Sequence, residues 1–379
     1  MSLAASLKDY ALDLGYAAVG IAAADPFDAF ADDLVSRGEP YAFYRQSPRR
    51  PLEGARPRDV WPQARSIIVV AYDYATRAFP QSLVGVIGRV YQARAYGPPP
   101  NRINGARREL FAAFLRENGL TLHDGITVPL RQAAARAGVA TFGNNNFAYA
   151  RGAGSFICLD AFVTDAELPP DAPTLRVPCP KGCTACRDAC PTGALLGPLR
   201  LEPRRCITFN NCFARDGWVP GVSGFIPHDI RRAMGSRIHG CDACQEACPR
   251  NKARLSLKLP PDPFLEGYAA AFRLADVLRM DEAYFHGPVQ QLMYNYIREK
   301  KFLQRNAAIA LGNAGDPEAV PPLVAALADP EPLVRGHAAW ALGRLATPPA
   351  RRALETARNH EAHEVVSREI ESALAGEAA

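Results

Sequence analysis

The chain has little of what marks an exported or membrane-spanning protein. No run of eighteen apolar residues occurs in its 379 positions, so no membrane-spanning helix is expected. Lys8, Asp9 and Asp13 interrupt the stretch where a signal peptide would be apolar, and the start lacks a twin-arginine signal. Ten cysteines are too few to make this long chain a disulfide scaffold. These absences predict a cytoplasmic protein without membrane contact, whose thiols are reduced or bind metal.

Other absences narrow the class of ligand. No G-x-G-x-x-G follows a predicted strand and no G-x-x-x-x-G-K-S/T occurs, so nucleotide fingerprints identify no cofactor. No RNP-type RNA-binding fingerprint is present either. The net charge is only +5, and 48% hydrophobic and 22% charged residues are globular values. This composition excludes a wholly disordered or collagen-like chain, and the length predicts two or three domains.

The first 170 residues alternate helical and strand patterns. Continuous apolar and β-branched runs predict buried strands, and segments that end at glycine predict helices. The expected strands lie within 17–22, 66–72 and 152–165, and the expected helices at 5–15, 107–118 and 133–137. This alternation is typical of an α/β or α+β domain.

Residues after 300 carry an internal repeat. The segment NAAIALG at 306–312 returns as HAAWALG at 337–343, an offset of 31, and a degenerate third copy ends at Leu374. Aspartate–proline pairs between the copies supply turns before helices. Paired helices that recur at a fixed period form an α-solenoid, and this period is similar to that of short HEAT-like repeats.

Eight cysteines crowd into two runs that each end C-x2-C-x3-C-P. The first run holds Cys179, Cys183, Cys186 and Cys190, and the second holds Cys206, Cys241, Cys244 and Cys248. Thiolates on tight loops bind iron–sulfur cubanes, and in two-cluster ferredoxins the last cysteine of each run ligates the other cluster. Cluster one is therefore predicted at Cys179, Cys183, Cys186 and Cys248, and cluster two at Cys206, Cys241, Cys244 and Cys190. Structural zinc also uses C-x2-C pairs, but the two C-x3-C-P endings favour two 4Fe-4S clusters.

The two remaining cysteines have no ligand pattern. Cys158 lies in an apolar strand and is predicted to be a plain buried thiol, and Cys212 has no assigned role. Two cubanes transfer electrons but do no chemistry on a substrate by themselves. The residues before them are therefore expected to hold a catalytic cofactor.

Several motifs in chain order resemble one known family. They are LGYAAVGI at 14–21, WPQARSIIVV at 61–70, AGSF at 153–156, RCIT at 205–208 and, most specific, GSRIHGCDACQ at 235–245. Asp124, seven residues before Arg131, is similar to the family's D-x6-R segment. On these motifs residues 5–255 resemble the epoxyqueuosine reductases, cobalamin-dependent iron–sulfur enzymes of queuosine biosynthesis.

The resemblance implies an α+β chain in three parts. They are an α/β cobalamin-binding catalytic domain (1–170), a ferredoxin-like domain with two 4Fe-4S clusters (171–262), and linker helices with HEAT-like repeats (263–379). It also implies base-off cobalamin, with contacts from Tyr96, Asp124, Ala148 and Thr208. The implied substrate is tRNA carrying epoxyqueuosine, and the implied proton donor is Asp124, which by its His-Asp-Gly context alone reads as a turn residue. A flavodoxin or ferredoxin as electron donor and a monomeric state complete the expectation.

Departures from the family pattern keep alternatives open. Leu130 replaces a usual glutamate, Asn144–Asn146 lacks a usual lysine, and 96–101 differs from the usual segment. A related corrinoid iron–sulfur reductase of a small molecule, dehalogenase-like, is one alternative, and a non-catalytic ferredoxin-type carrier is another. Residues 199–258 hold eleven Lys/Arg and five acidic residues. This excess fits either phosphate contacts or docking of an acidic electron donor.

Overall fold

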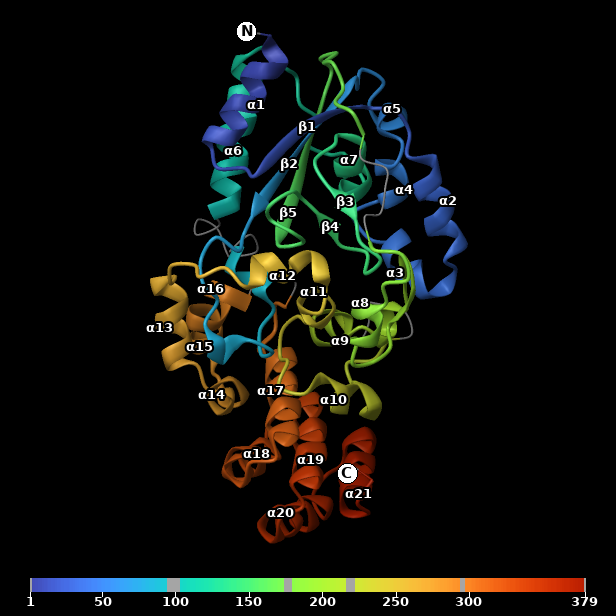
Figure 1. Ribbon diagram of the computed structural model, residues 1–379. Coiled ribbons are helices and arrows are strands. Elements are labelled where there is room, and N and C mark those ends of the chain that lie inside the picture. The colour runs from blue at the N-terminus through green and yellow to red at the C-terminus, as the bar shows by residue number, and fades with distance from the viewer. Residues whose placement is uncertain (1, 94–102, 174–178, 216–221, 294–296, 378–379) are drawn as a thin grey trace.

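The computed structural model describes residues 2–93, 103–173, 179–215, 222–293 and 297–377 (Figure 1). An N-terminal sheet with helices lies at one end, the cysteine-rich segments lie in the middle, and a stack of helices forms the other end. Tyr96 and the predicted loop at 97–101 fall outside the described residues. None of the helices in these ranges is long and apolar enough to cross a membrane.

The central sheet of the N-terminal part is antiparallel. Its strands run in the order β1 (Ala18–Ala23), β2 (Ser66–Asp73) and β5 (Ile157–Thr164). All three predicted strands are thus confirmed, and β2 is central because its continuous apolar run buries both faces. The antiparallel pairing decides the open choice of class in favour of α+β.

Helices cover both faces of this sheet (Figure 1). Because side chains alternate along a strand, Ile68 and Val70 pack with α1 (Leu3–Asp13) and α6 (Ile103–Glu117) on one face. Ile67 and Val69 pack on the other face, where α7 (Leu130–Arg136) contributes. Shorter elements complete this part: α2 (Asp28–Ser36), α3 (Ala42–Arg45), α4 (Pro51–Gly54), α5 (Pro57–Val60), β3 (Thr141–Phe142) and β4 (Ala148–Tyr149).

The cysteine-rich middle consists of short elements joined by tight loops. They are α8 (Ala185–Asp188), β6 (Leu195–Gly197), β7 (Arg200–Leu201), α9 (Ile207–Phe213), α10 (His228–Met234), α11 (Ala243–Glu246) and α12 (Pro249–Leu255). The helices α13 (Pro263–Ala271), α14 (Leu274–Arg279), α15 (Glu282–Tyr284) and α16 (Gln290–Met293) follow beside them.

The C-terminal helices form the predicted solenoid. They are α17 (Lys300–Ala314), α18 (Val320–Ala326), α19 (Pro332–Leu345), α20 (Pro348–Arg358) and α21 (Glu364–Leu374). The repeat segments lie on α17, α19 and α21, which pack side by side. Gly312 permits the close approach, because a side chain there would collide with Ala341 of α19. The division at 170 and 262 stays a prediction.

Candidate functional site

A cavity of about 550 Å³ lies between the N-terminal part and the cysteine-rich middle. Its wall combines the start of α7, the loop before β4 and part of β5 with the loops around α9 and α11. Walls from two parts of the chain make this junction the candidate active site.

Four cysteines of the predicted cluster two meet at this cavity. Cys190, Cys206, Cys241 and Cys244 all line it. Burial first, and then the neighbouring thiolates of Cys241, Cys206 and Cys190, raise the pKa of the Cys244 thiol. The fold therefore gathers one cysteine from the first run with three from the second, as the spacing predicts.

The cysteines predicted for cluster one gather away from the cavity. Burial and then the neighbouring Cys248 and Cys179 raise the pKa of the Cys186 thiol, while Cys183 lies beside Cys186 in a shallow surface hollow. Cys248, from the second run, thus joins the first run. Among the described residues, no three Cys, His or acidic side chains converge closely enough for a single metal ion. Four soft thiols per set fit a cubane, and the predicted ligand sets stand as a proposal.

Cys158 and Cys212 occupy different surroundings. Cys158 is half-buried and lines the cavity, so its prediction as a plain core thiol is wrong, because this side of β5 faces the cavity instead of packed helices. Burial raises its pKa to about 12, which keeps it a neutral thiol. Cys212 is buried behind cluster two, with its sulfur 3.5 Å from both the Tyr91 hydroxyl and His239 Nδ1.

The residues predicted to contact cobalamin are partly brought together. Ala148 and Thr208 both line the cavity, from opposite walls. The amide Nδ2 of Asn146 is buried in the same wall and has no hydrogen-bond partner among the described residues. A cavity of this size with apolar wall residues and a buried free amide donor fits a large ring that carries polar substituents. Tyr96 lies outside the described residues.

Asp124 lies outside the cavity lining. It is in a turn between α6 and α7, with its side chain 70% exposed and 3.3 Å from Arg116, and it is near Arg108. Three residues further, Thr127 lines the cavity. The carboxyl group therefore reaches the cavity only if this loop moves.

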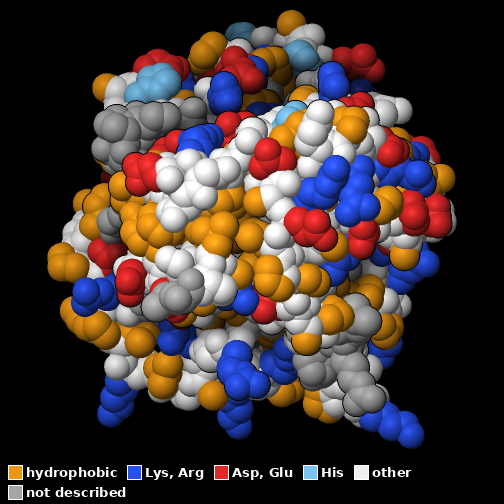
Figure 2. All heavy atoms as spheres, turned by 90° about the horizontal axis from the view of Figure 1, so that it is seen from above, with side chains coloured by type: hydrophobic (Ala, Val, Ile, Leu, Met, Phe, Trp, Pro, Cys, Tyr) orange, Lys and Arg blue, Asp and Glu red, His pale blue; other side chains and the backbone are white. Residues whose placement is uncertain are grey.

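Part of the basic run at 199–258 is turned inward. Arg231 is buried against Glu369, and Arg254 pairs with Asp73 in the N-terminal part. Arg250 lies over the ring of Tyr149. These three arginines serve as internal contacts. Phosphate contacts or docking of an acidic electron donor by the other basic residues of the run, such as the exposed Arg232 and Lys252, stay predictions. Figure 2 views the N-terminal end instead, where Lys/Arg and Asp/Glu side chains are intermixed.

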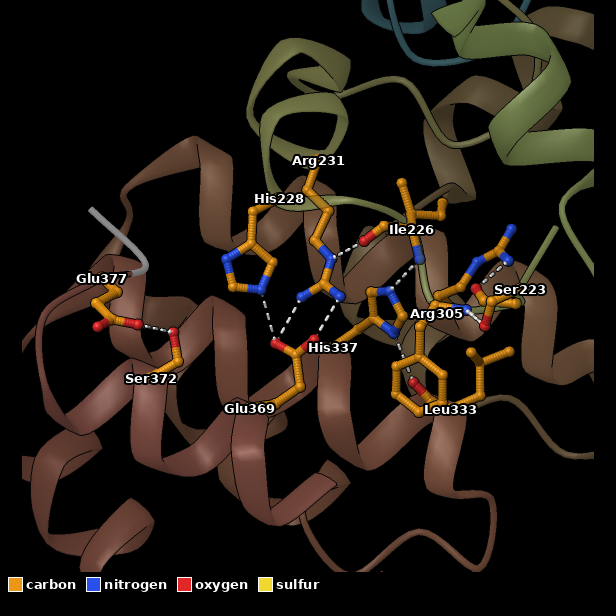
Figure 3. A network of polar contacts seen from close by, with 12 residues as sticks. Ser223, Ile226, His228, Arg231, Arg305, Leu333, His337, Glu369, Ser372 and Glu377 are labelled. Atoms are coloured by element: carbon orange, nitrogen blue, oxygen red, sulfur yellow. Dashed lines mark hydrogen bonds and ion pairs between the residues drawn. The ribbon is translucent and has the colours of Figure 1, made fainter. Parts of the chain in front are cut away.

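The solenoid is bonded to the cluster-two loops by residues that sequence reasoning missed. Asn306 donates from its amide to the carbonyl oxygens of Asn211 and Ile238, each at 2.8 Å. His337 accepts from the Ile226 amide and contacts the Leu333 carbonyl (Figure 3). Each of these residues is the first of its repeat segment. A polar residue at the start of an otherwise apolar segment is the sequence feature that could have indicated these contacts.

A buried ion pair closes the same junction (Figure 3). The guanidinium of Arg231 contacts the two carboxylate oxygens of Glu369 at 2.8 and 2.6 Å, and His228 adds a third contact. Glu369 follows His337 by 32 residues, so it occupies the same place in the third repeat. Arg305 is also buried here and donates to the carbonyls of Asn210, Ala214 and Gly224.

The fold and the site define the class of iron–sulfur oxidoreductases, with one group of thiols at the ligand cavity and a second group away from it. Residues 179–251 match the family model for a 4Fe-4S double cluster binding domain, and residues 298–375 match that for HEAT repeats. The chain belongs to the epoxyqueuosine reductase family. It is 30% identical to the epoxyqueuosine reductase of Bacillus subtilis, over 97% of this chain and 94% of that protein. It is 29% identical to the Escherichia coli enzyme, over 90% and 89%.

Solved structures of this family have the same fold. A crystal structure of an epoxyqueuosine reductase with an epoxyqueuosine-modified tRNA-Tyr stem loop matches with a TM-score of 0.81 and 30% identity, over 99% of this chain and 98% of that one. A structure of the B. subtilis enzyme with its catalytic aspartate loop swung out of the active site also matches at 0.81 and 30% identity, over 98% of each chain. The expected α+β class, the double-cluster region and the HEAT-like repeats are confirmed.

Proposed function

We propose that this chain reduces epoxyqueuosine in tRNA to queuosine, with electrons that pass through two 4Fe-4S clusters to a cobalamin. The observation that carries the proposal is the cavity, because all four cluster-two thiols open onto the space that Ala148 and Thr208 line. Family membership supports the same substrate, since relatives that span nearly this whole chain are named epoxyqueuosine reductases.

The residues divide the work between electron transfer and proton transfer. Removing an epoxide oxygen as water takes two electrons and two protons. When bound, cobalamin would supply the low-valent metal centre that reduces the epoxide. Cys190, Cys206, Cys241 and Cys244 line the cavity, so they would hold cluster two at its wall. The cluster-one cysteines lie away from the cavity, where a small electron-donor protein such as flavodoxin or ferredoxin would reach them.

Asp124 is our candidate proton donor, and it requires a moving loop. In its present place the carboxylate is exposed and faces Arg108 and Arg116. Three residues extend to about 10 Å, so a rearrangement that starts at Thr127 would bring Asp124 into the cavity. The B. subtilis structure with its aspartate loop swung out supports a mobile loop here. In the closed arrangement Asp124 would protonate the departing oxygen, because an alkoxide leaves poorly.

One assay tests the proposal against its alternatives. Protein reconstituted with iron, sulfide and cobalamin is given a strong reductant and a tRNA stem loop that carries epoxyqueuosine, and queuosine is measured by mass spectrometry. The free epoxyqueuosine nucleoside and a halogenated aromatic compound are offered in parallel. We expect turnover of the stem loop. Turnover of only a small compound would favour the dehalogenase-like alternative, and a protein that retains no corrinoid would favour a plain electron carrier.

A further inference from the structure

The hairpin between β3 and β4 reaches from the N-terminal part to the thiols of cluster one. The backbone N–H of Asn144 lies 3.4 Å from Cys179 Sγ. The hydroxyl oxygen of Tyr149 lies 3.2 Å from Cys248 Sγ, in buried surroundings. These two cysteines come from different runs, so one hairpin bonds both arms of the proposed ligand set.

The polar atoms around Tyr149 allow one consistent set of hydrogen bonds. Asn145 Nδ2 donates to the Tyr149 oxygen at 2.9 Å, and its second hydrogen points to the carbonyl of Cys244 at 3.2 Å. Asn145 Oδ1 accepts from the Phe147 amide at 3.3 Å. The Tyr149 hydroxyl has two acceptors within 3.2 Å, Asn145 Oδ1 and Cys248 Sγ. Because Asn145 already donates to the hydroxyl oxygen and its Oδ1 already accepts from the Phe147 amide, we assign the single phenol proton to Cys248 Sγ.

The surroundings of Tyr149 fix the orientation of its ring. The Arg250 guanidinium lies 3.8 Å from the ring centre and is held by the Phe142 carbonyl and the Thr141 hydroxyl. At Gly143 a side chain would collide with the Tyr149 ring. The hairpin therefore fixes the Tyr149 ring with its hydroxyl group beside the Cys248 sulfur.

We propose that Tyr149 sets the reduction potential of cluster one by a hydrogen bond to the Cys248 sulfur, with Asn145 as its positioning residue. A reduced cluster carries one more negative charge, which spreads over its sulfurs. A donor aimed at a sulfur stabilises that state and raises the potential. Through this bond the catalytic part of the chain adjusts how readily electrons enter the cluster farther from its own cavity. The inference rests on the cluster assignment proposed above but not on the substrate.

The test compares two tyrosine-to-phenylalanine variants. Tyr149→Phe removes the phenol beside Cys248, and Tyr91→Phe removes an equally buried phenol whose sulfur neighbour, Cys212, belongs to neither ligand set. Each protein is reconstituted, its iron is counted, and its clusters are titrated with reductant and followed by electron paramagnetic resonance. In Tyr149→Phe we expect full iron and a more negative potential for one cluster only. In Tyr91→Phe we expect both cluster potentials to stay as in the unmodified protein.

A second variant tests the positioning role. Asn145→Ala keeps the phenol but frees it to rotate, so the potential of cluster one should shift in the same direction as in Tyr149→Phe. The double variant, Asn145→Ala with Tyr149→Phe, should show no larger shift than Tyr149→Phe alone. Unchanged potentials in Tyr149→Phe, or an equal shift in Tyr91→Phe, would overturn the inference. If Tyr149→Phe fails to hold iron, the inference is tested by Asn145→Ala instead, and unchanged cluster potentials in iron-loaded Asn145→Ala would overturn it. The titration uses neither tRNA nor cobalamin, so a failure of the substrate assignment shows separately.

Discussion

The ion pair between Arg231 and Glu369 gives the sharpest stability prediction. Glu369→Gln keeps the side-chain shape but removes the charge, and it leaves the buried guanidinium of Arg231 without its bidentate carboxylate. Breaking a buried pair from one side costs about 3–5 kcal/mol. That is a large part of the roughly 5–15 kcal/mol that stabilises a domain. We expect the solenoid to open far more often in this variant.

Hydrogen exchange followed by mass spectrometry measures that opening directly in peptides from α19 and α21. Since about 1.4 kcal/mol corresponds to a factor of ten, a cost of about 3–5 kcal/mol should lower protection by roughly 10²- to 4 × 10³-fold. Glu355→Gln is the matched control, because Glu355 pairs with Arg351 on the exposed side of α20. Such surface pairs contribute about 0.3–0.5 kcal/mol, so its protection should barely change.

Two outcomes would refute this reasoning. One is a loss of protection in Glu369→Gln no larger than in the control. The other concerns the double variant Arg231→Met with Glu369→Leu, which leaves no uncompensated charge and should recover most of the protection. If the double variant is as unstable as Glu369→Gln, the cost comes from packing at this junction and not from the unpaired charge.

Four further predictions use other parts of the molecule. Cys244→Ala should lose about four of eight irons by colorimetric assay while retaining cobalamin, and stoichiometric zinc instead of iron would contradict the cluster assignment. Asp124→Asn should retain both clusters and normal reduction of the cofactor but lose turnover by roughly 10²–10⁴-fold, and full turnover would mean that Asp124 is only a turn residue. Burial, then the charges of Arg231 and Arg305, hold the pKa of His337 well below 6.5, so only the unfolded chain takes up this proton below pH 6.5. As the pH decreases below 6.5, the solenoid should therefore lose stability, by up to about 1.4 kcal/mol per pH unit. Urea titrations should show a smaller loss over the same pH range in His337→Gln. Truncation before Lys300 should reduce the iron content. A truncated protein with all eight irons would show that the cluster-two loops keep their structure without the solenoid.

The sequence predicts those features that a short stretch of chain determines. The strand at β2 is predictable because its β-branched run is continuous. The exchange of Cys190 and Cys248 between the two runs, which the spacing predicts, stays a proposal. The bonds of Tyr149 are not predictable, because Cys248 lies 99 positions away and no local pattern marks the pair. The inward place of Arg231 is unpredictable for a related reason, because charge in the sequence does not indicate which arginines are buried.

The repeat heads show how the solenoid contributes to the cluster site. Asn306, His337 and Glu369 occupy one position of successive repeats, and each bonds to the cysteine-rich middle instead of to solvent. Asn306 in particular satisfies the carbonyl of Ile238, three residues before Cys241. A buried carbonyl that loses its partner costs about 1–3 kcal/mol, so the loop that carries this thiol depends on α17 for its shape. From the opposite side, Asn145 bonds the carbonyl of Cys244. The loops that carry the proposed cluster-two thiols are therefore bonded to the N-terminal part on one side and to the solenoid on the other, so α17 is part of the same folded unit as these cysteines.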